Sequence, residues 1–238
     1  MRNEVIGVIG AMKAEIKSLR ERMSGAVSET VAGMEFVSGK IGSTSVVLVQ
    51  SGVGKVNAGI CTQILADRFQ VTHVINTGIA GSLNDRIDIG DIVVSTDAGY
   101  HDVDVTHLGY KAGEVPGLNC RFFEADPEFR KIIRDAVIEC TPEIRLFEGR
   151  IMSGDQFISS TVQKQRIRRV FNAMCCEMEG AAIAQTAMLN HIPFVIVRFI
   201  SDKADDSGTM DYAKFEAEAA DRSARILADV LEHLGHQA

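Results

Sequence analysis

The chain has 238 residues, a mass of 25.9 kDa, 46% hydrophobic residues and 24% charged residues. This balance, with 21 glycines and 4 prolines, excludes disordered, collagen-like and low-complexity proteins. The net charge is −7 and the chain has no long basic run, so we do not expect a nucleic-acid partner.

Short runs rich in β-branched residues recur along the chain and predict strands. Several of these runs are apolar at every position, which is typical of strands buried on both faces of a sheet. The predicted strands are residues 5–9, 34–39, 45–50, 73–77, 91–95, 145–152 and 194–201.

Longer segments with the spacing of amphipathic helices lie between these runs. They are residues 12–23, 56–68, 128–140, 161–171, 179–189 and 211–234, with Pro127 suited to open the third and Gly235 to end the last. The alternation predicts an α/β fold, a three-layer α/β/α sandwich around a central mixed, largely parallel sheet. No linker or repeat divides the chain, so we expect one domain over residues 1–238.

The cysteines Cys61, Cys120, Cys140, Cys175 and Cys176 are odd in number and form no C-x-x-C pair. This usage is typical of a reducing compartment rather than of a disulfide framework. The N-terminus has no apolar stretch of the signal-peptide kind, and no run approaches the roughly 20 apolar residues of a membrane helix. We therefore expect a cytoplasmic protein with no membrane partner.

Two motifs are similar to ligand sites without matching them. Residues 51–55, Ser-Gly-Val-Gly-Lys, have the glycines and lysine of a phosphate loop, but Val56 stands where that loop needs Ser or Thr. Residues 101–104, His-Asp-Val-Asp, offer metal-ligating groups, but in an extended segment His101 points away from both aspartates. We expect a solvated or loop-stabilising role for this second motif, no metal ion and no other cofactor.

Glu15 follows the first predicted strand and falls in the first turn of the first helix. A carboxylate is favoured at a helix N-terminus by about 0.3–1 kcal/mol, so a structural role is one interpretation. Ligands also bind at the carboxyl ends of strands in open α/β sheets, which makes Glu15 a candidate site residue.

Glu177 and Glu179 are two residues apart and, in an extended segment, point to the same side. Two like charges there are unfavourable unless they are paired or face solvent or a ligand. One glutamate is suited to cap the helix that begins here, but capping does not explain the other.

Arg198 lies inside the last predicted strand, and Asp202 follows at the end of that strand. A period of two places both on one face. A buried arginine is unfavourable without a carboxylate partner, which Glu177 or Glu179 can supply. Asp202 either makes a local cap or faces a ligand at the carboxyl end of the strand.

In this order, these segments resemble the nucleoside phosphorylase superfamily, and within it the bacterial 5′-methylthioadenosine/S-adenosylhomocysteine nucleosidases. The likeness begins near residue 4 and extends into the final helix. The motifs that carry it are residues 7–12 with Glu15, then 51–55, 76–81, 90–95, 100–106, 153–158, 177–180 and 200–202. The resemblance implies a nucleoside phosphorylase-like form of the predicted sandwich.

The resemblance also implies hydrolysis of the N-glycosidic bond of 5′-methylthioadenosine and S-adenosylhomocysteine, with 5′-deoxyadenosine as a related substrate. Asp202 matches the acid that protonates adenine N7, with Ser201 beside it, and Glu15 matches the residue that activates water. The other matching positions are Glu179 and Met178 at the ribose, Glu177 and Arg198 near ribose and water, Phe157 and Ile158 at the adenine, and Met12, Ile79, Ala80, Gly81 and Tyr212 around the substrate.

These residue types suit that chemistry. Adenine is a poor leaving group unless it is protonated, and cleavage leaves an oxocarbenium-like sugar. An acid on the base side with carboxylates on the sugar side follows the logic of a two-carboxylate glycosidase. Asp202 then needs a pKa well above ~3.9, which burial can provide, whereas Glu15 has to stay ionised.

Three departures from the family pattern bear on the preferred 5′ substituent: Ile79 replaces a frequent Ser, Leu108 a larger aromatic residue, and Tyr212 a common Phe. A phosphorylase is one alternative, because Lys13 offers a positive charge near the first glycine loop, although Glu15 would repel phosphate. A hydrolase of a related adenine nucleoside such as aminodeoxyfutalosine is another. A non-catalytic nucleoside-binding homologue is the third.

The long connection over residues 100–119 carries apolar and aromatic side chains that a solvated loop does not need. Loops of this length are usually functional or disordered, and exposed apolar groups often mark contacts. The resemblance implies a homodimer in which Val105, Leu108, Tyr110 and Pro116 of one subunit cover the 5′-thio substituent in the other subunit's site. The alternative is a loop that folds onto its own domain.

Overall fold

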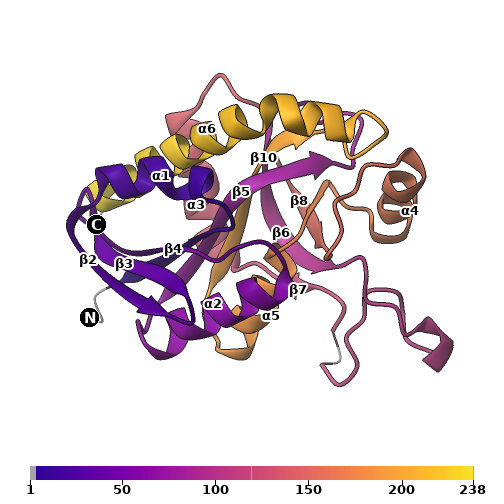
Figure 1. Cartoon of the computed structure of the whole chain (residues 1–238), viewed down its shortest axis with the longest axis horizontal. Helices are drawn as coiled ribbons and strands as arrows, with labels where there is room; N and C mark the ends of the chain where they lie inside the picture. Colours follow the sequence, from indigo (N-terminus) through magenta and orange to yellow (C-terminus); the bar gives the residue numbers. More distant parts are fainter. Residues whose placement is uncertain (1–3, 119, 238) are drawn as a thin grey trace.

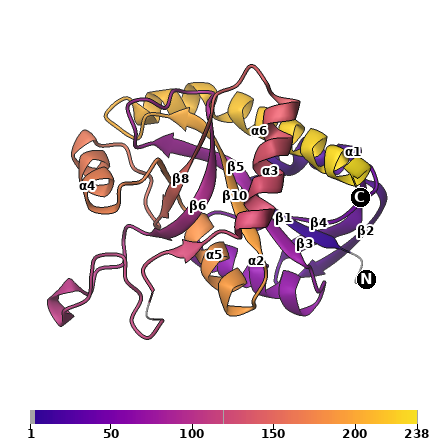
Figure 2. The same ribbon diagram turned by 180° about the vertical axis from the view of Figure 1, so that it is seen from behind.

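The computed structural model of the chain describes residues 4–118 and 120–237. Helices lie on both faces of a central sheet (Figure 1). Helices α1 (Lys13–Arg22), α3 (Pro127–Cys140) and α6 (Gly208–Gln237) pack together on one face, and α2 (Lys55–Asp67) and α5 (Gly180–Leu189) on the other (Figure 2). The predicted three-layer α/β/α sandwich is confirmed.

Within the described residues, the sheet has ten strands in the order β10-β6-β8-β9-β5-β1-β4-β3-β2, with β7 paired to β6. β10 also pairs with β5, so β5, β10, β6, β8 and β9 close into a ring. The strands are β1 (Val5–Gly10), β2 (Ser24–Val31), β3 (Met34–Ile41), β4 (Thr44–Gln50), β5 (His73–Ser82), β6 (Ile92–Tyr100), β7 (Phe123–Glu124), β8 (Leu146–Ser153), β9 (Cys175–Glu177) and β10 (Phe194–Asp202).

The predicted mixed sheet is confirmed. It was expected to be largely parallel, whereas parallel and antiparallel pairings are equal in number among the described residues. The parallel pairs include β1 with β4 and with β5, and β10 with β5. The sequence did not predict β2, β7 and β9, and each adds an antiparallel pair. β2 is exposed along nearly its whole length, and β7 and β9 are very short, so none has an apolar run that predicts it.

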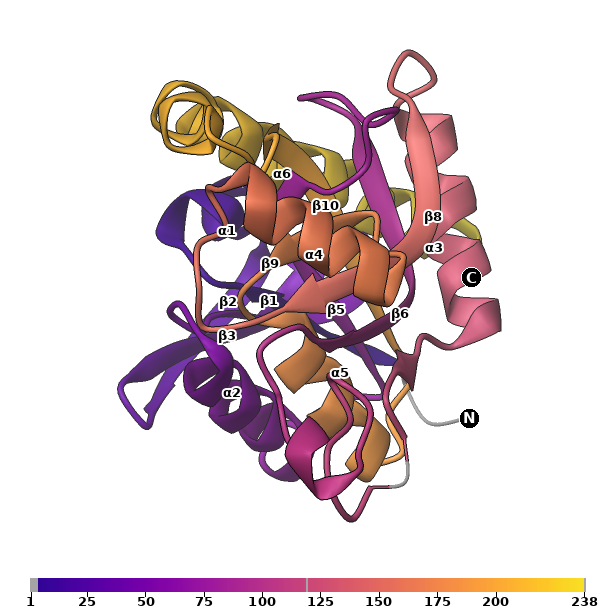
Figure 3. The same cartoon turned by 90° about the vertical axis from the view of Figure 1, so that its right-hand side faces the viewer.

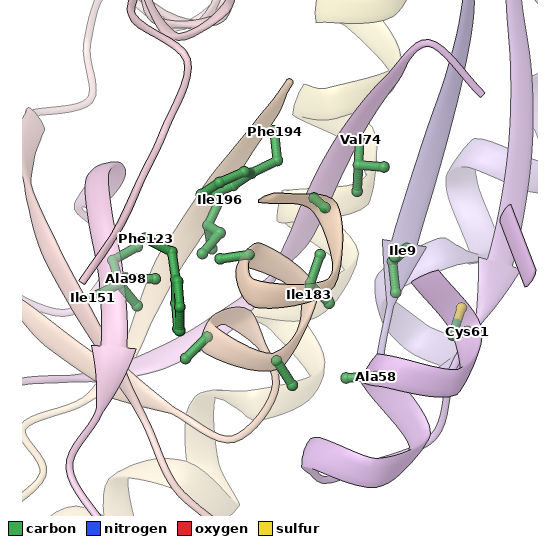
Figure 4. Close-up of a cluster of buried hydrophobic side chains, with 14 of the residues drawn as sticks. Ile9, Ala58, Cys61, Val74, Ala98, Phe123, Ile151, Ile183, Phe194 and Ile196 are labelled. Carbon is green, nitrogen blue, oxygen red and sulfur yellow. The ribbon is translucent and has the colours of Figure 1, made fainter. Parts of the chain in front are cut away.

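Strand β10 shows why the central strands are apolar at every position. Phe194 and Ile196 belong to the hydrophobic cluster beneath α2 and α5, while Val195 and Val197 belong to the cluster beneath α1, α3 and α6. Figure 4 shows the first cluster, to which β1, β5, β6, β8 and β10 contribute. Burial on both faces removes the polar alternation of a half-exposed strand.

The two remaining helical elements lie at the edge of the sandwich. Helix α4 (Thr161–Phe171) packs at one end of the sheet, where Ile167 and Phe171 join a third, smaller hydrophobic cluster (Figure 3). A short 3-10 helix, η1 (Thr106–Leu108), lies within the connection after β6, which projects away from the sheet in Figure 1.

The predicted end of the last helix at Gly235 is wrong. Helix α6 continues to Gln237, and the carbonyl oxygen of Gly235 accepts a hydrogen bond from the Ser43 hydroxyl. Contact with the turn before β4 therefore overrides the helix-ending preference of glycine at this position. Over residues 4–118 and 120–237, no helix has the length and apolar character needed to cross a membrane.

Candidate active site

A cleft of about 480 Å³ lies where the carboxyl ends of β1, β5, β9 and β10 meet. Its lining combines apolar surface with several carboxylates: Ala11, Met12, Glu15, Val53, Ile79, Ala80, Gly81, Phe157, Cys176, Glu177, Met178, Glu179, Ser201, Asp202 and Tyr212.

Glu15 occupies the first turn of α1, as predicted, and is buried. Its carboxylate accepts the backbone N–H of Met12 at 2.9 Å and that of Ile79 at 3.1 Å. Burial raises the pKa of Glu15, and the positive charge of Arg198 and the backbone N–H donors only partly oppose this. The helix N-terminus was expected to keep Glu15 ionised. Burial acts in the opposite direction, because it favours the protonated form.

Arg198 is 1% exposed and lies one layer behind the cleft. Its guanidinium donates to Asn76 Oδ1 and to the carboxylate of Glu177. The predicted carboxylate partner of this buried arginine is thus Glu177, and Glu179 Oε2 lies 4.0 Å from the same nitrogen. Arg198 and Asp202 were predicted to share one face of the strand because side chains alternate between the two faces. A bulge between Ile200 and Asp202 interrupts this alternation.

Glu177 is the glutamate that caps α5. Its carboxylate accepts the backbone N–H groups of Glu179 at 3.0 Å and Gly180 at 2.7 Å, and the hydroxyl of Ser153. Burial alone would raise the pKa of Glu177, but Arg198 and these hydrogen bonds outweigh burial and hold the pKa below its ordinary value. Glu177 is therefore a negative charge that belongs to the scaffold of the site.

The Glu179 side chain does not cap α5, and it lines the cleft. Its Oε1 atom accepts the backbone N–H of Gly54 at 2.8 Å. Burial and the neighbouring negative charge of Glu177 raise the pKa of Glu179 to about 7. This carboxyl group is therefore poised to change its protonation state near neutral pH.

Asp202 ends β10 and is buried in the wall of the cleft. Its Oδ2 atom accepts the Ser201 hydroxyl at 2.9 Å, and Oδ1 accepts the backbone N–H of Ala204 at 2.8 Å. Burial raises the pKa of Asp202 although both hydrogen bonds oppose it. The direction is the one that a proton donor requires.

Two aromatic rings stand on the apolar side of the cleft. Phe157 and Tyr212 meet edge to face with ring centroids 5.1 Å apart, and the Tyr212 hydroxyl lies 3.6 Å from Met12 Sδ. Phe157 is 45% exposed, which leaves part of its ring available to a planar ligand. Ile158 lines an adjoining pocket of about 240 Å³ that also reaches Asp202.

The comparisons with known proteins agree with this geometry. Residues 5–232 match the sequence profile of the Phosphorylase superfamily. The chain belongs to this superfamily. The 5′-methylthioadenosine/S-adenosylhomocysteine nucleosidase of Staphylococcus haemolyticus is 39% identical over 231 residues, which are 97% of this chain and 100% of that protein.

Solved structures of superfamily members extend the similarity to three dimensions. The nucleosidase of the same name from Neisseria meningitidis, in complex with methylthio-immucillin-A, superposes with a TM-score of 0.92 at 36% identity and covers 97% of this chain and 99% of that chain. The futalosine hydrolase of Helicobacter pylori gives a TM-score of 0.91 at 30% identity, covering 97% and 98%. The family resemblance is confirmed: this superfamily member groups with the nucleosidases, which are N-glycosyl hydrolases.

The fold of this superfamily member gathers most predicted site residues at one place. Those that line the cleft are Glu15, Ser201, Asp202, Glu177, Met178, Glu179, Phe157, Met12, Ile79, Ala80, Gly81 and Tyr212. Ile158 lies in the adjoining pocket, and Arg198 supports the carboxylates from behind. Over the described ranges, no group of three or more His, Cys, Asp or Glu side chains is arranged to hold a metal ion.

The sequence interpretation missed several contributors to the site. Val53 and Cys176 line the cleft, and Ser153 and Asn76 hold Glu177 and Arg198. Val53 lies in the glycine motif of residues 51–55, which is one of the motifs of the family resemblance, but no role was assigned to Val53 itself. The roles of Ser153 and Asn76 depend on contacts between strands distant in sequence, so no local pattern predicts them.

The residues predicted to serve a neighbouring subunit lie apart from the cleft of their own chain. None of the four, Val105, Leu108, Tyr110 and Pro116, is among its lining residues as far as the described chain extends. Leu108 is 65% exposed. Val103, Val115 and Leu118 pack against the main core, so the base of the loop folds onto its own chain while its tip does not. Asn119 lies outside the described residues.

Proposed function

We propose that this chain hydrolyses the N-glycosidic bond of 5′-methylthioadenosine and S-adenosylhomocysteine, and also of 5′-deoxyadenosine. Adenine and the corresponding 5-thioribose or deoxyribose product are released. The observation that carries the proposal is that Glu15, Glu179 and Asp202 line one cleft. Burial raises the pKa of Asp202, which is the direction that a proton donor requires.

The proposed mechanism begins with proton transfer from Asp202 to adenine N7. Protonation makes adenine a neutral leaving group, and the C–N bond breaks toward an oxocarbenium-like sugar. The Ser201 hydroxyl, 2.9 Å from Asp202 Oδ2, orients the carboxyl group. Glu15 takes a proton from a water molecule as that water attacks the sugar carbon. Two carboxyl groups with divided tasks follow the logic of glycoside hydrolysis.

The remaining cleft residues bind the substrate in this proposal. Glu179 accepts hydrogen bonds from the ribose hydroxyls, and Met178 packs on the sugar. Phe157 stacks on adenine, and backbone groups at Ile158 contact the edge of the base. The exposed face of Phe157 and the pocket beside Ile158 support these assignments.

A phosphorylase is less well supported by the geometry. Lys13, the cation that suggested an anion site, lines a separate groove with Lys17 and Arg20 and is not among the cleft-lining residues of the described chain. The negative charge of Glu177 lies in the cleft wall instead. Phosphate would meet repulsion here, whereas water would not.

Hydrolysis of a futalosine-type nucleoside is the second candidate. A specific observation favours it: the futalosine hydrolase structure from Helicobacter pylori superposes on this chain with a TM-score of 0.91. This reaction would use the same three carboxylates, so the substrate assay has to separate the two. A binding protein without catalysis would have no use for Glu15 beside the sugar.

We further propose a homodimer in the cytoplasm, in which the loop tip covers the partner's 5′ pocket. The exposed Leu108 and Tyr110 support this, because apolar groups at a projecting tip gain stability only when covered. Under two-fold symmetry each subunit would give and receive one loop.

Chromatography of the products tests the proposed function. Methylthioadenosine, adenosylhomocysteine, 5′-deoxyadenosine and aminodeoxyfutalosine are each incubated with the protein, with and without phosphate and EDTA, and inosine serves as the control. We expect adenine and a free reducing sugar from the first three, unchanged by phosphate or EDTA. Formation of a sugar 1-phosphate would overturn hydrolysis, and turnover of the futalosine alone would favour the second candidate.

A further inference from the structure

Three segments around the cleft meet at Lys55, Asp102 and Asp155. The ammonium group of Lys55 donates to Asp102 Oδ2 at 2.6 Å. The backbone N–H of Asp155 donates to the same oxygen at 2.9 Å. The backbone N–H of Lys55 donates to Asp155 Oδ1 at 2.9 Å, so each residue contacts the other two. We refer to these three residues as the Lys55 network.

The Lys55 network contacts the turn that binds Glu179 in the proposed ribose site. Lys55 begins α2, and the preceding residue, Gly54, donates its N–H to Glu179 at 2.8 Å. Gly54 has a φ of +98°, and a Cβ there would lie 3.2 Å from Asp155 Oδ1. The close approach of Asp155 therefore fixes the turn that presents this N–H to Glu179.

The Lys55 network also includes the residue that begins the proposed adenine-binding segment. Asp155 comes shortly before Phe157 and Ile158, which line the cleft and its adjoining pocket. Both the backbone and the side chain of Asp155 are held by the network. The start of the adenine-binding segment is thereby fixed to the turn that holds Glu179.

Within the Lys55 network, the pair of Lys55 and Asp102 is sheltered enough for its charges to matter, whereas the Asp155 side chain is 52% exposed. The side chains of Lys55 and Asp102 are 23% and 13% exposed, so their attraction is screened less than that of a surface pair. Although burial opposes ionisation, the Lys55 ammonium and the Asp155 N–H hold the pKa of Asp102 below its ordinary value. The ammonium group also lies 5.3 Å from the centroid of the Tyr100 ring.

We propose that Lys55 is a positioning residue that fixes Glu179 and the segment of Phe157 and Ile158 in one arrangement through Asp102 and Asp155. The proposal rests on the proposed function of the cleft. Lys55 is not among the cleft-lining residues of the described chain, so it acts through the groups that it holds. This positioning role gives the glycine–lysine motif a function, although the motif does not match a phosphate loop.

Asp102 also lies near the start of the projecting loop, which suggests a rival task for Lys55. If Lys55 served only to hold that loop, its loss would weaken only ligands with a 5′ substituent. Adenine alone has no such substituent. The affinity for free adenine therefore distinguishes the two tasks.

The experiment compares Lys55→Met, Lys55→Arg and the control Lys131→Met, whose lysine forms an exposed pair with Asp135 on α3. For Lys55→Met we expect kcat/KM for methylthioadenosine to fall ~10²-fold, the loss that a displacement of about 1 Å can cause. The Kd for adenine, measured by calorimetry, should rise ~10-fold because the unanchored segment has to be ordered on binding. Lys55→Arg keeps the charge and should recover most of both losses, and Lys131→Met should match the wild type.

Wild-type values in Lys55→Met, or a lower kcat/KM with an unchanged adenine Kd, would overturn the proposal. If Lys55→Met does not fold, Asp102→Asn weakens the same contact and should show the same two changes in smaller measure. A wild-type protein that releases no adenine would refute the proposed function instead. The adenine Kd would still test the positioning role in that case.

Discussion

Glu177 and Arg198 form an ion pair that is almost wholly removed from solvent, with side chains 3% and 2% exposed. The pair joins β9 to β10: Glu177 lines the cleft, and Arg198 lies behind it. Arg198 is also the positive charge that opposes the raised pKa values of Glu15 and Glu179. One arginine therefore supports both the stability of the ring of strands and the electrostatics of the site.

Removal of this arginine should destabilise the fold strongly. Arg198→Met leaves Glu177 buried without its partner, and breaking such a pair typically costs about 3–5 kcal/mol. Urea unfolding followed by circular dichroism measures the change. The control is Arg20→Met, whose pair with Glu35 is 45% and 44% exposed and should be worth no more than about 1 kcal/mol. Equal losses in the two variants would contradict the importance of burial.

Asp202→Asn and Glu15→Gln should lose activity for different reasons. Asparagine cannot transfer a proton to adenine N7, and glutamine cannot take one from water. Groups of this kind contribute ~10²–10⁴-fold to the rate, so kcat for methylthioadenosine should fall by that factor. Both variants should retain the wild-type circular dichroism spectrum and bind a substrate analogue. An Asp202→Asn enzyme with a wild-type rate would show that the assigned acid is wrong.

Gly81 should be required for the position of Asp202. A Cβ at Gly81 would lie 2.7 Å from Asp202 Oδ1 and 2.9 Å from the Cβ of Ala204. Gly81→Ala should displace the carboxyl group and reduce kcat ~10²-fold. In α2, a Cβ at Gly59 would meet only Thr186 Oγ1, at 3.7 Å. Gly59→Ala should keep full activity and stabilise the protein by up to about 1 kcal/mol. Loss of activity in both variants would refute the steric argument.

Glu179 should make the folded chain less stable as the pH rises. Its folded-state pKa is about 7, against an ordinary value of 4.5. Between these values the folded chain holds a proton that the unfolded chain has released, so the free energy of unfolding falls with increasing pH. The raised pKa values of Glu15 and Asp202 act in the same direction, and the lowered pKa of Glu177 acts in the opposite one.

Glu179→Gln isolates this contribution because glutamine cannot ionise and still offers an oxygen to the N–H of Gly54. Above the folded-state pKa, at about pH 8, the variant should be more stable than the wild type by on the order of 1–3 kcal/mol. Near the ordinary pKa, at about pH 4.5, the difference should largely vanish. Urea unfolding at both pH values measures it. A constant difference would show that Glu179 does not titrate between them.

The sequence predicted the parts of the site that follow single strands. Glu15 lies in the first turn of the helix after β1, and Asp202 is the last residue of β10, so the carboxyl ends of these two strands bring both to one cleft. The predicted partner of Arg198 was limited to two glutamates because burial of an arginine demands a carboxylate. Which of the two glutamates caps α5 depended on the conformation of the turn, so local spacing left it open.

Local sequence patterns could not predict the features that depend on the register between strands distant in sequence. The pairing of β10 with β5 closes the ring of strands, and the bulge before Asp202 changes its direction relative to Arg198. Asp102 looked like a possible metal ligand, yet its partners are Lys55 and the backbone of Asp155, far apart in the sequence. Only the folded arrangement brings such segments together.

The projecting loop supplies the last prediction, a homodimer that depends on Leu108. This side chain is 65% exposed at the tip of the loop, while Val103 and Val115 at its base pack on the core of their own chain. Leu108→Asp places a charge where apolar cover is expected, so burial in a partner's site would become unfavourable. We expect light scattering at micromolar protein to give a dimer for the wild type, and the variant to show a raised KM for methylthioadenosine. The loop base and the carboxylates are untouched, so the adenine Kd should change little. A fully active monomer would contradict the prediction, and so would a dimer whose KM is unaffected by the substitution.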